Sequence, residues 1–317
     1  MHALSKNSVE LLIVDETADN QRIDNFLINY LKGVPKSHIY RIIRSGEIRV
    51  NSGRVSQTYR LNLNDKVRIP PISKLVKDDN KQLVKTNFLS KLSIVFEDEF
   101  CLVVNKPSGL AVHGGSGIQA GLIEQLRQSR PEQRFLELVH RLDRDTSGLI
   151  MIAKKRLFLT KMHEIIRHGQ ITKHYFTFVH GLTKNQQTIR LSLLKSENSH
   201  GERQVKVNHQ GQEAITKIQT IKHYSEGSFL KVNLITGRTH QIRVHLSHIG
   251  HPLAGDDKYG DFVWNRELQR TLHLKRLFLH ATSLSFIHPI HQEKVHFEAP
   301  LSEDLQRFID QLHPLAS

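Results

Sequence analysis

The sequence has a single cysteine, few acidic residues for its many basic ones, and no long apolar run. Because Cys101 is the one cysteine among 317 residues, neither a disulfide within the chain nor a zinc site of several cysteines can form. Cys101 stands in an apolar run, where we expect a buried, inert thiol. No stretch approaches the roughly 20 apolar residues that cross a membrane, and residues 1–10 lack the apolar core of an export signal. We therefore expect a cytoplasmic protein with no membrane-bound part.

The shortage of acidic residues leaves a strongly basic chain. Lys and Arg total 45 against 31 Asp and Glu, which gives a formal net charge of +14 and a pI of about 9.8. Such a surface attracts polyanions, so nucleic acid is the first partner to consider. The chain is long for one hydrophobic core and short for three, and we expect two domains of unequal size.

Basic residues are concentrated near the start of the chain, where residues 32–68 hold nine Lys or Arg and two acidic residues. A helix capped by Asp19 or Asn20, a second helix over 37–44 and three short strands are predicted around them. A solvated charged face would also explain this composition. Basic residues shared between a helix and a strand are more typical of RNA binding, and we expect RNA contacts from four of them: Lys36, Arg41, Arg44 and Arg49.

This region resembles the αL RNA-binding domain, the type found in ribosomal protein S four and in many RNA-modifying enzymes. The resemblance rests on the segments 22–27, 37–46, 48–51 and 64–67. Asn64 stands at the position where the family usually has Gly, and Asn also tolerates a positive φ. We assign residues 19–70 to this domain, residues 71–87 to a polar linker, and residues 88–317 to a second domain.

The second domain alternates strands and helices without a strict βα repeat. Apolar runs and alternating patterns predict strands over 92–96, 100–104, 149–153, 174–180, 214–221, 229–235, 279–287 and 294–298. Helical spacing is found over 120–127, 157–167, 239–249 and 303–312. The order favours an α+β fold with a mixed, largely antiparallel sheet.

A polar loop, 140–148, runs directly into the predicted strand 149–153, as loops that carry chemistry often do. Its His-Arg-Leu-Asp sequence differs from a kinase catalytic loop by the inserted Leu142, and the other kinase motifs are missing. Asp143 and Asp145 have the spacing of a glycosidase pair. However, Arg141 and Arg144 favour ionised carboxylates, whereas a glycosidase acid must stay protonated. We expect the residues 145–147 to brace the loop through local hydrogen bonds.

Two further patterns do not predict cofactor chemistry. The glycine-rich stretch 114–117 lacks the residues of a phosphate-binding loop, and a surface loop is the better interpretation. Four histidines cluster at 240–251, yet no carboxylate or cysteine accompanies them. We expect them to be neutral hydrogen-bonding groups rather than ligands of zinc, and we expect no metal site.

Four separated segments, 105–109, 140–148, 171–176 and 237–256, together resemble the RluA-type family of RNA pseudouridine synthases. The resemblance implies the pseudouridine synthase fold and isomerisation of uridine in RNA, a reaction that needs no cofactor. It places the catalytic aspartate at Asp143, its arginine partner at Arg243, and a tyrosine that stacks on the flipped base at Tyr175. Arg141 would fill the space that the base leaves, and Leu246 would form the apolar wall of the pocket.

The remaining site residues are assigned from the same resemblance and from their charge. Lys106, Lys173, Arg238 and His240 are candidates for contacts with backbone phosphates, and His140 for a structural or RNA-binding role. The family member most similar to this chain modifies large-subunit rRNA, which makes 23S rRNA the expected partner of a monomeric enzyme. The alternative is a ribosome-assembly factor that binds RNA without catalysis.

Overall fold

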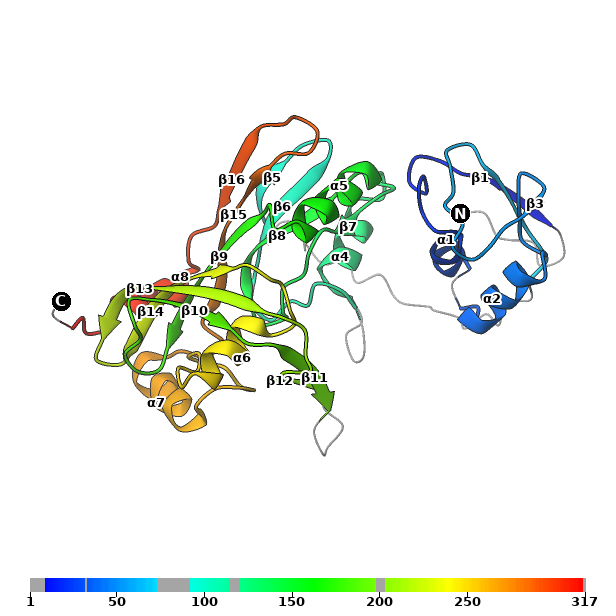
Figure 1. Ribbon diagram of the computed structural model, residues 1–317. Helices are drawn as coiled ribbons and strands as arrows, with labels where there is room; N and C mark the ends of the chain where they lie inside the picture. Colours follow the sequence, from blue (N-terminus) through cyan, green and yellow to red (C-terminus); the bar gives the residue numbers. More distant parts are fainter. Residues whose placement is uncertain (1–8, 32, 73–91, 115–119, 198–202, 316–317) are drawn as a thin grey trace. The chain divides into compact units, whose positions relative to one another are not determined.

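The computed structural model describes residues 9–31, 33–72, 92–114, 120–197 and 203–315. Contacts divide the chain into two compact units, Met1–Thr86 and Asn87–Ser317 (Figure 1). Most of the segment expected to be a linker, 71–87, lies outside the described residues. Each unit has its own hydrophobic core, one in the first unit and four clusters in the second.

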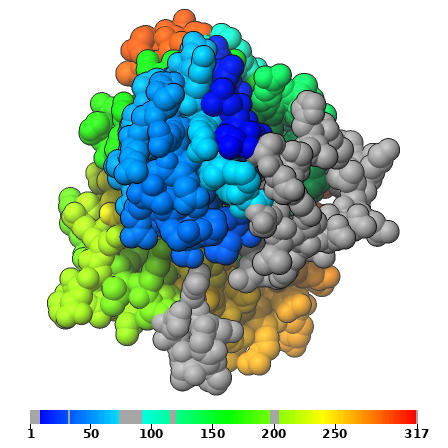
Figure 2. Space-filling view, turned by 90° about the vertical axis from the view of Figure 1, so that its right-hand side faces the viewer, coloured from blue at the N-terminus to red at the C-terminus, as the bar shows by residue number. Residues whose placement is uncertain are grey.

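Among its described residues, the first unit combines two helices with a four-stranded sheet of order β1-β4-β2-β3. Its elements are β1 (Glu10–Ile13), α1 (Ile23–Tyr30), α2 (Lys36–Arg44), β2 (Arg49–Val50), β3 (Gly53–Arg54) and β4 (Lys66–Ile69). Apolar side chains of both helices, among them Ile23, Leu27, Ile39 and Ile42, pack in one cluster with Val67 of the sheet. In the space-filling view of Figure 2 the blue and light-blue atoms of this unit form one continuous surface.

Two details of the first unit differ from the expectation. Strand β1 pairs with β4, so the unit includes residues before the expected start at 19. Helix α1 begins at Ile23, and neither of the two expected residues caps it. Asn20 has φ 58°, outside the helical region, and the Asp19 carboxylate accepts a hydrogen bond from the Leu63 N–H. Asn64 has φ 69°, as expected for the position that the family gives to Gly.

The second unit is built on a ten-stranded sheet with the path β10-β13-β14-β9-β15-β8-β6-β5. Strands β16 and β7 pair with β15 and β8 beside this path, and β11 and β12 form a separate hairpin. The bounds are β5 (Ser93–Glu97), β6 (Cys101–Lys106), β7 (Glu137–Leu138), β8 (Ser147–Ala153), β9 (Thr172–Val179), β10 (Gln186–Arg190), β11 (Leu193–Glu197), β12 (Arg203–Val207), β13 (Ile215–Tyr224), β14 (Gly227–Leu234), β15 (Leu279–Ile287) and β16 (Lys294–Glu298). All pairings among these described strands are antiparallel except β15 with β8, which confirms the expected α+β class.

Alternating residues of the central strands send apolar side chains to both faces of the sheet. Leu102 of β6 and Ile150 of β8 join the cluster that contains α4 (Leu122–Ser129). Val103 and Met151, the next residues along, join the cluster that contains α5 (Arg156–Arg167). The expected burial of Cys101 is confirmed, since it lies in the second of these clusters. Strand β8 is therefore buried along its whole length and forms a rigid base for the loop that precedes it.

Three helices complete the second unit: α6 (Gln241–His248), α7 (Phe262–Leu272) and α8 (Glu303–Asp310). Helix α7, strand β10 and the β11–β12 hairpin were not expected from the sequence. The hairpin and β10 are rich in polar residues, so they carry little of the apolar alternation that identifies strands. Figure 1 shows α6, α7 and this hairpin at the same end of the unit.

The parallel pairing of β15 with β8 brings two backbones unusually close at Gly148. Gly148 faces Ala281 in the register and has φ +106°. A Cβ atom there would lie 2.2 Å from the Ala281 carbonyl oxygen. This position therefore requires glycine for its backbone conformation and for its space.

We predict that Gly148→Ala lowers the free energy of unfolding by about 3 kcal/mol or more, because backbone strain and a backbone clash add together. Gly169→Ala is the matched control. Gly169 also has a positive φ, of +67°, but no atom lies within 4 Å of the added Cβ. The control should lose only about 1–2 kcal/mol. Equal losses for the two variants in urea denaturation would refute the close approach of the strands.

Candidate active site

The polar loop before β8 is held by the segment that follows β6. The Lys106 Nζ donates to the carbonyl oxygens of Pro107, Leu110 and Arg144, at 2.8–2.9 Å. The Ser108 hydroxyl donates to the Asp145 carbonyl at 2.7 Å, and the Gly109 N–H donates to the Arg144 carbonyl. These contacts fix the backbone next to Asp143 from outside the loop.

Lys106 cannot serve as the expected phosphate contact. Its side chain is fully buried, and the three carbonyls occupy all three N–H donors of the ammonium group. Burial lowers the pKa of Lys106 to about 7, while the charges of Asp145 and Asp143 act in the opposite direction. The sequence identified a lysine near the site correctly, but its role is to hold the loop.

A second brace acts at Ser147. Its hydroxyl bonds the His280 Nδ1 at 2.9 Å and accepts from the Arg276 Nη1 at 3.0 Å. Arg276 is itself anchored by Asp304. Burial lowers the pKa of His280 to about 4, so this imidazole is neutral. The expectation that the loop is braced by local hydrogen bonds is thus wrong for Ser147, whose partners are more than 120 residues away.

His140 belongs to the scaffold rather than to a binding surface. Its Nε2 accepts a hydrogen bond from the backbone N–H of Met151 at 3.2 Å, directly after β7 stops pairing with β8. Burial and the charge of Lys173 lower the pKa of His140 to about 3, which keeps the accepting nitrogen unprotonated. The imidazole satisfies a backbone N–H of β8 at the point where β7 ends. Of the two roles expected for His140, structural or RNA-binding, these contacts fit the structural one.

Asp143 faces Arg243 across the mouth of the loop, with 3.8 Å between Oδ2 and Nη1. The Asp143 carboxylate is partly exposed, at 19%, whereas Arg243 is buried in α6. Arg243 donates its Nε and Nη2 to the two oxygens of Asp256, each at 2.7 Å. This bidentate pair leaves Nη1 as the part of the guanidinium that faces Asp143.

Asp256 was not expected from the sequence, and it is the acid on which the site rests. It is fully buried and also accepts the backbone N–H groups of Lys258 and Tyr259, each at 2.9 Å. Burial alone would raise the pKa of Asp256, but the hydrogen bonds and charge of Arg243 lower it overall. For Arg243 burial acts to lower the pKa, and Asp256 and Asp143 raise it above its usual value. Both groups are therefore charged.

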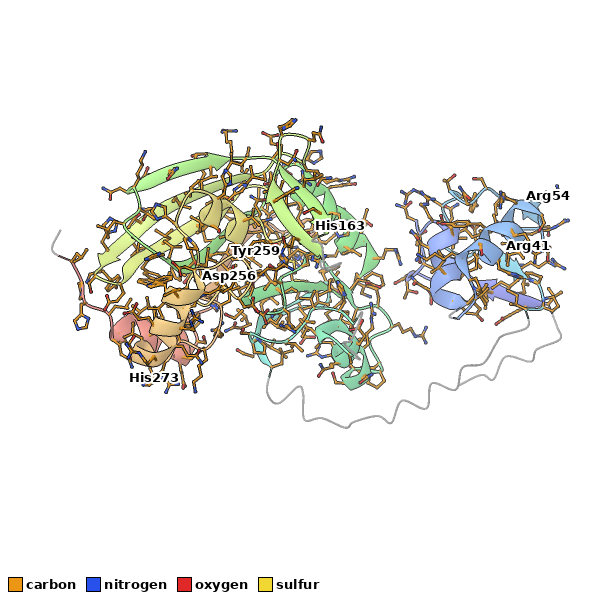
Figure 3. The ribbon with its side chains drawn as sticks, turned by 90° about the horizontal axis from the view of Figure 1, so that it is seen from below. Arg41, Arg54, His163, Asp256, Tyr259 and His273 are labelled. Carbon is orange, nitrogen blue, oxygen red and sulfur yellow. The ribbon has the colours of Figure 1, made fainter. Side chains whose placement is uncertain are left out.

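Tyr259 connects the two groups that face Asp143. The Arg243 guanidinium lies 5.2 Å from the centre of the Tyr259 ring, and the Tyr259 hydroxyl lies 2.8 Å from the His240 Nδ1. The His240 Nε2 in turn lies 3.9 Å from Oδ1 of Asp143. Figure 3 shows Asp256 and Tyr259 in the same region of the second unit. His240 thus faces the carboxylate, and its contacts differ from those expected of a phosphate-binding residue.

Tyr175 and Leu246, the two apolar site residues expected from the sequence, are buried in the core of the second unit. Tyr175 of β9 and Leu246 of α6 belong to one hydrophobic cluster, with 6% and 0% of their surface exposed. Burial and the nearby charge of Asp143 raise the pKa of Tyr175, so the phenol keeps its proton at neutral pH. Its hydroxyl makes no hydrogen bond with any described residue. The structure therefore places the Tyr175 ring near the Asp143 carboxylate, with Leu246 in the same hydrophobic cluster as Tyr175.

The three other basic residues expected to contact RNA in the second unit differ in their exposure to solvent. Arg141 is exposed and makes no ion pair with a described residue. Arg238 is exposed, and its Nε donates to the Glu213 carbonyl. Lys173 is 8% exposed, and burial lowers its pKa. Arg141 and Arg238 remain accessible to a phosphate or a base, whereas Lys173 reaches solvent only at its edge.

In the first unit all four basic residues expected to bind RNA are exposed: Lys36, Arg41, Arg44 and Arg49. Arg49 also lines a hollow of about 630 Å³, together with Lys66 and Arg68, which the sequence did not single out. Figure 3 labels Arg41 of α2 and Arg54 of β3 in this unit. Two elements therefore present cations to solvent, as expected for a phosphate-binding surface.

One group of possible metal ligands exists among the described residues: Asp98, Cys101 and His288. The His288 Nδ1 accepts backbone N–H groups of Ile290 and His291, so a neutral ring carries its proton on Nε2. That nitrogen points toward Asp98, at 3.5 Å, and would have to lose its proton to bind a metal. Nε2 forms no hydrogen bond with a described residue, and the tautomer that the Nδ1 contacts favour keeps a proton on the nitrogen that a metal would need. The histidines clustered at 240–251 were expected to be neutral hydrogen-bonding groups. His245 fits this expectation, since it hydrogen-bonds the Thr216 hydroxyl and the Leu191 carbonyl.

Comparisons with known proteins identify the families that the two units match. A family model described as RNA pseudouridylate synthase matches residues 100–248, and an S4 domain model matches residues 21–67. Two solved human structures, RNA pseudouridylate synthase domain containing 4 and 1, both superimpose with a TM-score of 0.55. They are 26% and 28% identical, and they cover 70% and 71% of this chain and 94% and 91% of their own.

Curated relatives match along nearly the whole chain. A ribosomal large subunit pseudouridine synthase C from Haemophilus influenzae is 48% identical over 310 residues, which cover 96% of each chain. The protein of the same name from Escherichia coli K12 is 46% identical, over 96% of this chain and 97% of its own. The chain belongs to the RNA pseudouridine synthases, within the group of ribosomal large subunit pseudouridine synthase C. It is therefore an isomerase that converts uridine to pseudouridine, as the resemblance implied.

We predict that Asp256→Asn lowers the free energy of unfolding by about 3–5 kcal/mol, because it leaves the buried Arg243 without its counter-charge. The rate of pseudouridine formation should fall about 10-fold or more, since the guanidinium is no longer held toward Asp143. Asp257→Asn is the control. Asp257 lies 3.6 Å from Arg243 but is 78% exposed, and its loss should change stability by less than about 0.5 kcal/mol.

The pH dependence of stability gives a second readout for the same pair. Because folding lowers the pKa of Asp256, its contribution is present above about pH 4 and is lost as pH falls through the folded value. Wild-type protein should therefore lose this stability in acid, and Asp256→Asn should show a flatter dependence. Parallel curves for the two proteins would contradict the assigned charge state.

Proposed function

We propose that this enzyme isomerises specific uridines of large-subunit (23S) ribosomal RNA, with Asp143 as its catalytic carboxylate. The observation that carries the proposal is the position of Asp143 opposite Arg243, which Asp256 holds in place. The relatives that match the full chain are named for action on the large ribosomal subunit. The basic chain fits an RNA substrate. The proposal also takes the enzyme to act as a monomer in the cytoplasm. Among the described residues no helix is long and apolar enough to cross a membrane.

The chemistry requires an ionised carboxylate at the nucleoside. The bond from N1 to C1′ breaks, the base rotates, a bond forms from C5 to C1′, and the proton on C5 is lost while N1 gains one. Asp143 begins this sequence either by attack on C1′ or by removal of a proton from the sugar to give a glycal. Both routes need the anionic form, which the guanidinium of Arg243 favours by its charge.

The other residues act on the flipped base. Removing a paired uridine from its stack costs a few kcal/mol. Tyr175 offsets part of this cost by stacking, worth roughly 1–3 kcal/mol per base. Because it keeps its proton, Tyr175 is suited to donate or relay a proton rather than to act as a strong base. Leu246 excludes water from the apolar side, and the exposed Arg141 fills the gap in the RNA stack.

The first unit docks the RNA by its phosphates. The exposed cations of α2 and β2 supply charge without base contacts, which suits positioning rather than sequence recognition. In the second unit Arg238 is the accessible candidate for a phosphate near the site. This division assigns affinity to the first unit and chemistry to the second.

We predict that Asp143→Asn binds rRNA nearly as well as wild type and forms no pseudouridine. The substitution removes the anion but keeps the size of the side chain. Asp145→Asn is the matched control, because Asp145 is two residues away and pairs with Arg144 rather than Arg243. A single-turnover assay on unmodified rRNA, read by reverse-transcription stops after carbodiimide treatment, measures both. Appreciable product from Asp143→Asn would overturn the assignment, and no product from wild type would favour an assembly factor that only binds.

Charge reversal on α2 tests the docking role. Arg41→Glu with Arg44→Glu should weaken RNA binding and flatten its dependence on salt. Each lost phosphate contact lowers the slope of log K against log salt concentration by about 0.7–0.9. Arg266→Glu with Arg270→Glu makes the same change of charge on an exposed face of α7 and should leave the slope nearly unchanged. Equal slopes for the two double variants would show that α2 does not hold RNA.

A further inference from the structure

The Asp143 carboxylate has a second neighbour besides Arg243. The His240 Nε2 lies 3.9 Å from Oδ1, and the Arg243 Nη1 lies 3.8 Å from Oδ2. Each oxygen therefore faces one nitrogen at nearly the same distance. A shift of about 1 Å would bring both pairs to hydrogen-bonding distance, and such contacts often tighten only when substrate binds.

The hydrogen bonds of Tyr259 determine which nitrogen of His240 carries the proton. The phenol oxygen accepts the backbone N–H of Val205 at 3.1 Å. Its own proton is then available for the His240 Nδ1, at 2.8 Å. A neutral imidazole that accepts at Nδ1 carries its proton on Nε2, the atom that faces Asp143.

The surroundings keep this imidazole neutral. Burial is the largest influence and lowers the pKa of His240 below its usual value. The charges of Asp143 and Asp256 raise it, and those of Arg243 and Lys258 lower it. With these groups and the Tyr259 hydroxyl around it, the ring is a neutral donor at pH 7. The neutral His240 ring then adds no positive charge at Asp143, and Arg243 is the cation that faces the carboxylate.

The backbone of His240 is also specialised for this placement. It has φ 53°, in the left-handed region, immediately before α6. This conformation costs free energy in any residue other than glycine. Arg243 follows within the first turn of the same helix, so α6 presents both donors to the carboxylate from one rigid element.

We propose that His240 is a positioning residue for Asp143: its Nε2–H binds one carboxylate oxygen while Arg243 binds the other, and Tyr259 fixes the tautomer that makes this possible. The inference rests on the proposed role of Asp143. It replaces the phosphate contact that was expected of His240. Two donors restrict the rotation of the carboxylate about its axis, and one donor would not.

Variants of His240 separate positioning from RNA binding. His240→Gln can place an amide N–H near the position of Nε2, whereas the shorter side chain in His240→Asn cannot reach Asp143. We expect His240→Asn to lower the single-turnover rate at saturating rRNA by about 10- to 100-fold, the value of a hydrogen bond to a charged group. His240→Gln should recover most of that loss, and RNA affinity should be similar in all three proteins. His248→Gln, at an exposed position of the same helix, is the control.

The pH profile tests the tautomer directly. In Tyr259→Phe the ring over Arg243 remains, but Nδ1 loses its donor, and the tautomer with a bare Nε2 facing Asp143 becomes populated. The rate relative to wild type should fall about 10-fold at pH 8 and recover as the pH falls through the pKa of His240, which burial holds below its usual value, because protonation restores the Nε2–H. In a His240→Gln background, Tyr259→Phe should cost little, because no tautomer remains to be set.

The outcomes distinguish this inference from the function on which it rests. A lower RNA affinity with an unchanged single-turnover rate in His240→Asn would make His240 a phosphate contact and overturn the proposal. A rate loss in Tyr259→Phe that is the same above and below the pKa of His240 would show a structural role only. Activity in Asp143→Asn, measured in the same assay, would instead refute the catalytic assignment itself.

Discussion

The buried pair of Arg243 and Asp256 is the interaction on which the rest of the site depends. A guanidinium with 4% of its surface exposed is stable only if a counter-charge shares its environment. Asp256 supplies that charge with two hydrogen bonds of 2.7 Å and is itself held by two backbone N–H groups. The cost of burial is offset within the pair, and one nitrogen of Arg243 remains for Asp143. A buried ion pair thus holds one guanidinium nitrogen toward the carboxylate that we propose as catalytic.

The opposing side of the site is fixed by equally extensive contacts. Lys106 binds three carbonyls near the loop, and Ser147 joins the start of β8 to His280 and Arg276. The loop that carries Asp143 is therefore held by hydrogen bonds from residues outside it. The Asp143 carboxylate is therefore oriented before substrate binds, and folding supplies most of the free energy needed to restrict its rotation.

Much of this could be predicted from the sequence, and the reasons for the failures are physical. Period-two and helical patterns located the central strands and most helices, and the family motifs brought Asp143, Arg243, Tyr175 and Leu246 to one region. Patterns do not say which way a polar atom faces. Lys106 was therefore expected at the RNA, although its ammonium group binds backbone carbonyls. A buried arginine calls for an acid, but only the fold distinguishes Asp256, fully buried, from the adjacent Asp257, whose side chain is 78% exposed.

The most direct test of this account is the structure of the protein bound to an RNA that contains its target uridine. The account predicts that Arg243 keeps both hydrogen bonds to Asp256 while the 3.8 Å separation from Asp143 shortens to a hydrogen bond. The uridine should lie unstacked between Asp143 and the ring of Tyr175. An Arg243 that leaves Asp256 to bind a phosphate, with Asp143 remote from the sugar, would contradict the central claim.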